Sequence, residues 1–202
     1  MSDVFYTPPA ADLQPITSDD PEFFTVAPRK LIVMMLLTHG LYGAYWLYQN
    51  WKHYKIRSGR PIWPLARTIL ALFYVPSLFC KIDRACKSKD ERGMPHWCAI
   101  GILYIFLPLA PFIVGMTFGV YRGFAGFDSA PVGFWFEFLT GTAVFVFQSL
   151  IVLRVQRFIN QANEDPNGQA NERYSLGNAI WIFFGMLIWL WMTVGMYITS
   201  QP

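Results

Sequence analysis

Long apolar runs separated by short polar segments dominate the pattern of this chain. Three runs, residues 97–121, 131–153 and 179–198, carry few or no ionisable groups, while a shorter one, 31–48, contains His39. Each is long enough, or nearly so, to cross about 30 Å of hydrocarbon as a helix that rises about 1.5 Å per residue. The runs lack the alternation of barrel strands, so the pattern predicts transmembrane helices.

A shorter apolar segment, residues 68–80, lies between Arg67 and Lys81. It runs for about 13 residues, whereas a comfortable crossing takes about 20. Prolines before and inside it suit an irregular, membrane-dipping segment better than a straight span. We therefore expect a re-entrant or interfacial helix over 64–80. The alternative is a short span, with Arg67 reaching the interface.

Charge counting compares the two topologies. If 64–80 does not cross, ten cations between residues 49 and 96 and three between 154 and 173 share one face, thirteen in all. The other face then has three, namely Arg29, Lys30 and Arg122. If the segment crosses, the split is ten to five. The positive-inside rule favours the first arrangement: an all-α integral membrane bundle of four spans plus the re-entrant or interfacial helix, with both termini outside. Five spans are the alternative.

Composition supports a membrane location. The chain is 54% hydrophobic and only 14% charged, which is unlike a soluble domain. Its net charge of +3 follows from the positive-inside rule, so no nucleic-acid partner is expected. Residues 1–28 are acidic and rich in proline, and no cleavable signal is evident. They predict a disordered tail before a helical membrane domain over 29–202.

Two ionisable residues within the predicted spans, His39 and Glu137, are candidates for function, because such groups are costly in lipid. Both lie nearer the outer ends of their helices under the favoured topology, so they could form a pair that relays protons or binds a cation. The alternative is a polar pair, or separate groups, that only hold the bundle together.

Glycines recur at four-residue spacing at the end of the run 97–121 and just beyond it, at Gly115, Gly119 and Gly123. Such a stripe lets another helix approach closely, so it predicts helix packing within the bundle or between protomers. Between the last two spans, the sequence Gln-Ala-Asn-Glu occurs twice, at 161–164 and 169–172, around an Asp-Pro-Asn-Gly turn. The two copies predict short helical extensions that face each other.

The basic loop predicts contact with anionic lipid head groups or an acidic protein partner. The candidate residues are Lys52, Lys55, Arg57, Arg60, Arg67, Lys81 and Arg84. The alternative is that these charges only fix orientation. The three cysteines match no usual zinc spacing, and no catalytic constellation or phosphate-binding loop is present in the sequence. No metal, no cofactor and no enzymatic activity are therefore expected.

Several short motifs stand near the two ends of the chain: Phe23-Phe24-Thr-Val-Ala-Pro28, Lys30-Leu31, His39-Gly40-Leu41-Tyr42, Tyr45-Trp46-Leu-Tyr48-Gln-Asn50-Trp51, Ile159-Asn160, and Asn171-x-Arg173-Tyr174-Ser175-x-Gly177-Asn178. In these motifs the chain resembles an uncharacterised family of bacterial multi-span inner-membrane proteins. His39 departs from the family, which more often has Phe there. The resemblance implies a bacterial inner-membrane protein, and it implies no activity, substrate or cofactor.

We therefore predict a binding or assembly role, or an accessory subunit, in an envelope complex, with a protein partner or a second copy of the chain. The competing hypothesis is a small transporter or channel that uses His39 and Glu137.

Overall fold

The computed structural model describes residues 21–89, 92–110, 113, 115–117, 120 and 132–199, with the backbone alone for 132–138, 196, 197 and 199. All regular elements in these ranges are helical, which confirms the predicted all-α class. In chain order they are α1 (Pro28–Leu37), α2 (Leu41–Ser58), α3 (Pro64–Ile69), α4 (Ala71–Ser88), α5 (Trp97–Phe106), α7 (Val132–Ala162), the 3-10 helix η1 (Gln169–Asn171) and α8 (Leu176–Thr199).

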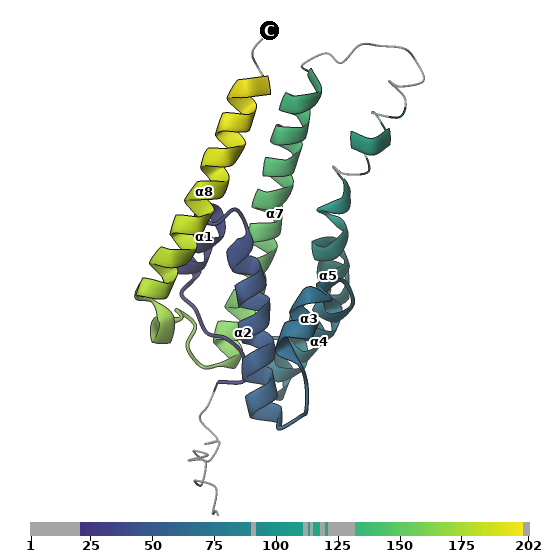
Figure 1. Ribbon diagram of the computed structural model, residues 1–202. Helices are drawn as coiled ribbons and strands as arrows, with labels where there is room; N and C mark the ends of the chain where they lie inside the picture. The colour runs from purple at the N-terminus through teal and green to yellow at the C-terminus, as the bar shows by residue number, and fades with distance from the viewer. Residues whose placement is uncertain are drawn as a thin grey trace, which may run out of the picture.

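The long helices α7 and α8 run antiparallel, and α1 contacts both of them (Figure 1). We call the end of the molecule at which the chain passes from α7 to α8 the loop end. Two helical stretches among the described residues, Leu139–Ala162 and Leu176–Gly195, are long and apolar enough to cross a membrane. Four spans were predicted, so the described helices support only part of that bundle.

The single helix predicted over 31–48 is wrong. The chain instead forms α1 and α2, which reverse direction at residues 38–40 (Figure 1). His39 and Gly40 both have positive φ angles, 47° and 83°. Their amides donate hydrogen bonds back to carbonyls in the last turn of α1, in the pattern of a Schellman cap. A helix-ending motif therefore divides what looked like one apolar run.

The segment 64–80 forms α3 and the first half of α4, which separate at Leu70. α4 continues past Cys80 as far as Ser88, because its apolar positions keep helical spacing and pack into the core. Its buried apolar residues are Val75, Leu78, Phe79, Ile82, Ala85 and Cys86. The other face of α3 and α4 exposes large apolar side chains.

Residues 23–27 are extended and buried, so the disordered tail predicted over 1–28 is wrong for its last residues. Residues 1–20 lie outside the described residues. Asn163 and Asn171, which flank the turn between α7 and α8, donate hydrogen bonds to this segment. The described chain therefore begins at the loop end, whereas the predicted topology puts the N-terminus and this loop on opposite sides of a membrane; the sides themselves stay a prediction.

The other predicted spans differ from the helices mainly at their ends. α7 extends the predicted 131–153 as far as Ala162, because further residues at helical spacing remain buried. α8 contains the whole of 179–198. α5 covers only the first part of 97–121 and ends shortly before Pro108, which disfavours the helical turn that precedes it.

Candidate functional site

His39 lies at the tip of the turn between α1 and α2, between Phe145 of α7 and Trp189 of α8. The centroid of its imidazole is 5.0 Å from that of Phe145 and 4.9 Å from that of the Trp189 ring. Its Nδ1 atom is buried and has no hydrogen-bond partner among the described residues. A strained backbone and an unsatisfied polar atom together make His39 a candidate functional residue.

Glu137 lies on α7 eight residues closer to its N-terminus than Phe145, which corresponds to about 12 Å of helix rise. Because Phe145 contacts His39, the backbone of Glu137 is offset from the tip by about two helical turns. The side chain of Glu137 lies outside the described residues. The His39–Glu137 pair therefore stays a prediction.

The turn that carries His39 is held by two side chains. Thr38 Oγ1 donates a hydrogen bond to the Met34 carbonyl (2.7 Å) and accepts one from the Tyr42 amide (3.0 Å), which joins the end of α1 to the start of α2. Trp189 Nε1 donates to the Leu36 carbonyl (3.1 Å) and ties the tip to α8. The tip is thus held both by hydrogen bonds within the turn and by a hydrogen bond from α8.

Gly185 allows α8 to approach the tip. It lies one turn before Trp189, and a Cβ atom at this position would collide with the backbone of Leu37 and Thr38. A larger residue would force the two helices apart, since backbone atoms cannot move aside as a side chain can.

The predicted glycine stripe is described only in part. Gly115 is half-buried in a helical turn, whereas Gly119 and Gly123 lie outside the described residues. The close helix approach predicted for that stripe is seen instead at Gly185, between α8 and α1. Gly185 could have been noticed in the sequence as a glycine within a long apolar run. The four-residue spacing drew attention to Gly115, Gly119 and Gly123 instead.

The buried segment 23–27 is surrounded by amide side chains, which we call the amide cluster: Asn50, Gln156, Asn160, Asn163 and Asn171. Gln156 Nε2 donates to the Phe24 carbonyl (3.0 Å), and Asn160 Nδ2 donates to the Val26 carbonyl (3.0 Å). Asn50 Oδ1 accepts from the Phe24 amide (3.2 Å). Side chains thus supply the partners that a neighbouring strand would supply in a sheet, and the buried backbone is satisfied.

The amide cluster is also connected internally. Gln156 Nε2 donates to Asn160 Oδ1 (2.7 Å), and Gln156 Oε1 accepts from the indole of Trp46. Asn50 Nδ2 in turn donates to the Trp46 carbonyl (2.8 Å). Asn50, Trp46 and Gln156 are fully buried, so this network links α2 to α7 within the core.

The two Gln-Ala-Asn-Glu copies contribute equivalent asparagines to the cluster. Asn163 Nδ2 donates to the Phe23 carbonyl (2.7 Å) and to Thr25 Oγ1 (2.8 Å), and Asn171 Nδ2 donates to the Thr25 carbonyl (3.1 Å). The first copy ends α7 and the second forms η1, so both form helical turns. Their shared contact is Thr25.

The turn between these copies lies directly against the segment. The carboxylate of Asp165 accepts hydrogen bonds from the amides of Ala170 and Gln169, each at 2.9 Å. These bonds, with that to Ala170 the strongest influence, hold the pKa of Asp165 below its ordinary value. Gly168 has a φ of 68°, and a Cβ atom there would collide with the backbone of Ala27. The glycine therefore meets both a conformational and a steric requirement.

Lys30 is a buried cation near the start of α1. Its Nζ donates to Asn171 Oδ1 (2.6 Å) and to the Arg173 carbonyl (2.7 Å), and lies 5.8 Å from the centroid of the Tyr174 ring. Burial lowers the pKa of its ammonium group. Lys30 thus ties α1 to the loop that precedes α8.

Two of the predicted lipid or partner contacts stack on aromatic rings. The guanidinium of Arg67 lies 4.4 Å from the ring centroid of Trp51 and 5.0 Å from that of Tyr74. Lys81 Nζ lies 4.6 Å from the ring centroid of Tyr54 and donates to its hydroxyl (3.1 Å). Both cations therefore help to hold α3 and α4 against α2.

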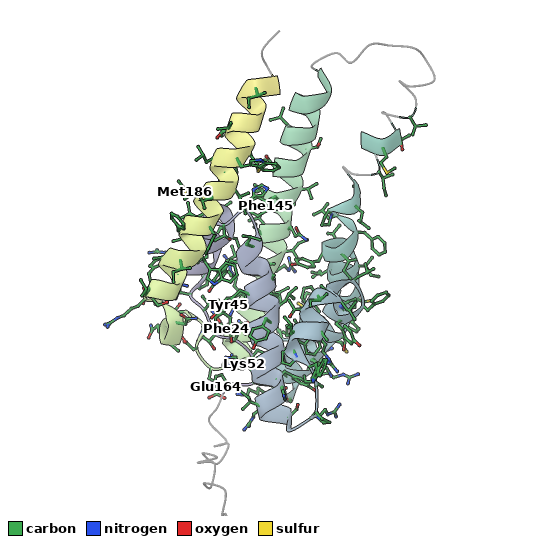
Figure 2. The ribbon with its side chains drawn as sticks, in the orientation of Figure 1. Phe24, Tyr45, Lys52, Phe145, Glu164 and Met186 are labelled. Atoms are coloured by element: carbon green, nitrogen blue, oxygen red, sulfur yellow. The ribbon has the colours of Figure 1, made fainter. Side chains whose placement is uncertain are left out.

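The remaining predicted contacts are exposed: Lys52, Lys55, Arg57, Arg60 and Arg84. Figure 2 shows Lys52 at the loop end, near the level of Glu164 and far from Phe145. Glu164 forms an ion pair with Lys89 (2.6 Å), which lowers the pKa of its carboxyl. Contact of these residues with lipid or a partner therefore stays a prediction.

The cysteines Cys80, Cys86 and Cys98 form no disulfide, and the thiol of Cys86 donates a hydrogen bond to the Phe158 carbonyl (3.4 Å). No group of three His, Cys, Asp or Glu residues in the described part of the chain is placed to hold a metal ion. The structure thus offers no described residues from which to build a metal site.

Residues that carry the resemblance at the two ends of the chain lie together in the fold. The N-terminal Phe24 contacts Asn50 and Gln156, and Asn160 and Asn171 bind the same segment. Sequence reasoning assigned these amides no contact with residues 23–27, although Gln156 and Asn160 recur at helical spacing in α7 and Asn163 follows its last residue. No protein-family profile, curated protein or solved structure matches the chain. The resemblance itself therefore stays a prediction.

Proposed function

We propose that the protein is a multi-pass integral protein of the bacterial inner membrane, with its loop end in the cytoplasm. The main support for this proposal is the uneven distribution of the Lys and Arg residues over the fold. Fifteen of the sixteen Lys and Arg residues lie at the start of α1, in the second half of α2, in or around α3 and α4, near the end of α7, or in the turn before α8. These parts of the chain lie in the half of the molecule nearer the loop end (Figure 1). α5, α8 and the part of α7 before Arg154 carry none. The sixteenth, Arg122, lies outside the described residues. Such asymmetry is what the positive-inside rule expects.

In this membrane frame, α1 and α2 form a re-entrant hairpin. His39 at the tip contacts Phe145, which lies nine residues, or about 13 Å of helix rise, from Arg154. That distance is close to half of a hydrocarbon layer of about 30 Å, so the tip lies near the middle of the bilayer. The chain enters and leaves this hairpin on the cytoplasmic side, whereas α7 and α8 cross the bilayer. This arrangement puts the N-terminus inside and the C-terminus outside.

We also propose that the protein acts as a binding or assembly subunit of an envelope complex. The support is the apolar surface of α8, which touches the rest of the protein mainly through α1 and α2. Its exposed large apolar residues are Leu176, Ile180, Phe183, Phe184, Met186, Leu187, Leu190, Trp191, Val194 and Ile198. A helix that is apolar all round and largely uncovered is suited to lipid and to a partner helix. No catalytic step is assigned to the protein.

Reporter fusions test the topology. A reporter that is active only in the periplasm should be inactive at the N-terminus and active at the C-terminus. A cytoplasmic reporter should give the opposite pattern. Periplasmic activity at the N-terminus would refute the re-entrant hairpin.

Cross-linking tests the assembly role. Single cysteines replace Phe183 or Trp191 on α8 in a chain that lacks its native cysteines, with a cysteine at the exposed Ile102 of α5 as the matched control. Cross-linking in native membranes should trap a partner or a second copy from the α8 positions more than from the control. The proposal is contradicted if no cross-linked product forms from any position and if the protein is also recovered as a lone monomer in mild detergent.

A small transporter or channel is the second candidate. The unsatisfied Nδ1 of His39, enclosed near the middle of the proposed bilayer, favours it. The expected relay would involve His39 and Glu137. Ion flux in proteoliposomes should then fall in His39→Ala and in Glu137→Gln, and flux that survives both changes excludes the relay.

A further inference from the structure

Two cavities on α7 adjoin at Arg154. Their volumes are about 540 Å³ and about 550 Å³. The first of the pair is lined by Arg92, Gly93, Pro95, Arg154, Arg157, Phe158 and Gln161. The second is lined by Leu103, Leu107, Phe147, Leu150, Ile151 and Arg154.

 A third cavity, of about 660 Å³, lies beside Lys30 and shares no lining residue with either of these two. The pair thus forms one continuous feature with a cationic part and an apolar part.

The change from apolar to cationic follows one face of α7. Phe147, Leu150, Arg154, Arg157 and Gln161 follow one another at intervals of three or four residues, which places them on the same side of the helix. The opposite side of this part of α7 packs into the core and carries the amide cluster. The face with the two cavities is therefore not needed for the internal contacts of α7.

The cationic cavity has the chemistry of a phosphate site. Three guanidinium groups line it, from Arg92, Arg154 and Arg157, and no carboxylate is found among its described lining residues. Arginine binds phosphate through paired N–H donors in a planar fork, and it keeps its charge at every physiological pH. A ligand with a negative phosphate group fits this cavity best.

The apolar cavity shows what else the ligand must have. It lies between α5 and α7, and its lining apart from Arg154 is entirely apolar. We propose that the two cavities together bind an anionic phospholipid, with the phosphate on the three arginines and an acyl chain between α5 and α7. This inference rests on the proposed membrane insertion, because the same frame puts Arg154 at the cytoplasmic interface. A free phosphate would leave the apolar cavity unused.

Lipid retention tests the site. The full-length protein in mild detergent is mixed with dioleoyl phosphatidylglycerol or dioleoyl phosphatidylcholine, and bound lipid is counted by native mass spectrometry. The wild-type chain should retain phosphatidylglycerol in preference to phosphatidylcholine. Equal retention of the two lipids overturns the proposal.

Matched variants locate the lipid. Arg154→Gln combined with Arg157→Gln should weaken retention of phosphatidylglycerol about tenfold or more, because charge-assisted hydrogen bonds are lost. Arg173→Gln removes an exposed arginine from the segment before α8, outside both cavities, and should leave retention unchanged. Leu150→Trp, which fills the apolar cavity, should weaken retention while the arginines remain. Loss in Arg173→Gln equal to that in the double variant would show non-specific attraction and overturn the site.

Two further measurements separate the alternatives. Glycerol 3-phosphate, which has the head-group phosphate without acyl chains, should compete weakly, and competition as strong as that of the lipid would indicate a free-phosphate site instead. Resistance of the wild-type protein to alkaline extraction from membranes tests the insertion independently. A protein that is extracted by alkali refutes the proposed function, whereas an inserted protein without lipid preference refutes only this site.

Discussion

The buried carboxamide of Gln156 on α7 accepts a hydrogen bond from the indole N–H of Trp46 on α2. The two residues are 110 positions apart in the chain, and both are inaccessible to solvent. The same carboxamide uses its N–H groups on Phe24 and Asn160, so its donors and its acceptor all have partners. One side chain therefore connects the N-terminal segment, the hairpin and the longest described helix.

Replacing Gln156 should destabilise the fold. Gln156→Leu leaves the Trp46 indole and the Phe24 carbonyl without partners in the core, and each such group costs roughly 1–3 kcal/mol. The free energy of unfolding, measured in mild detergent, should fall by about 3 kcal/mol. Gln161→Leu, at an exposed position of the same helix, should change it by less than about 0.5 kcal/mol. Equal effects at both positions would contradict the role of the amide cluster.

Gly185 is expected to be intolerant of even one methyl group. Gly185→Ala places a Cβ atom against the Leu37 and Thr38 backbone, so α8 must shift away from the tip. Overpacking of this kind lowers the free energy of unfolding by about 2 kcal/mol. The control is Gly177→Ala on the same helix, where the nearest atom to the new Cβ is Ser175 Oγ at 3.6 Å. A loss at Gly185 no larger than at Gly177 would disprove the close contact.

Asp165 should make stability depend on pH in the acid range. Its folded pKa lies below the ordinary value of 3.8, so its contribution is fully present above pH 3.8 and is lost as the pH falls through the folded pKa. Asp165→Ala should lower the free energy of unfolding by about 1 kcal/mol near pH 6. The difference between wild type and variant should shrink below pH 3.8. A difference that stays constant down to pH 2 would exclude the carboxylate as its source.

Arg67 should stabilise α3 through stacking and not through charge alone. Arg67→Gln removes the guanidinium from the rings of Trp51 and Tyr74 and should lower the free energy of unfolding by about 1 kcal/mol. Arg60→Gln removes the same charge from an exposed loop position and should have little effect. In a Trp51→Leu background, the effect of Arg67→Gln should diminish, and an undiminished effect would argue against the stacking.

Sequence pattern predicts the long helices well and the hairpin poorly. The apolar run 179–198 has no interruption, so its length and composition are enough to place α8 within a few residues. The run 31–48 is also largely apolar but contains Thr-His-Gly, a helix-ending signal that the surrounding apolar residues obscured. Whether such a run breaks depends on turn chemistry and on the partners of the turn, and only the fold shows those partners.

The candidate site shows the same division. His39 is recognisable from the sequence because an ionisable residue interrupts an apolar run. Its neighbours Phe145 and Trp189 are not recognisable, because no periodicity shows which helix faces the tip. The amide cluster depends on contacts between residues far apart in the chain, and local pattern carries no information about such pairing.

The hydrogen bonds that hold residues 23–27 impose an order on biosynthesis. Their partners on α7 and η1 follow 132 to 146 residues later in the chain. At about 5–20 residues per second, the ribosome needs on the order of 10 s to add them. Residues 23–27 thus leave the ribosome well before α7 and η1, but they acquire these hydrogen bonds only after both have been synthesised. In the proposed topology, the carbonyls of residues 23–27 therefore remain on the cytoplasmic side without these partners until α7 has been inserted.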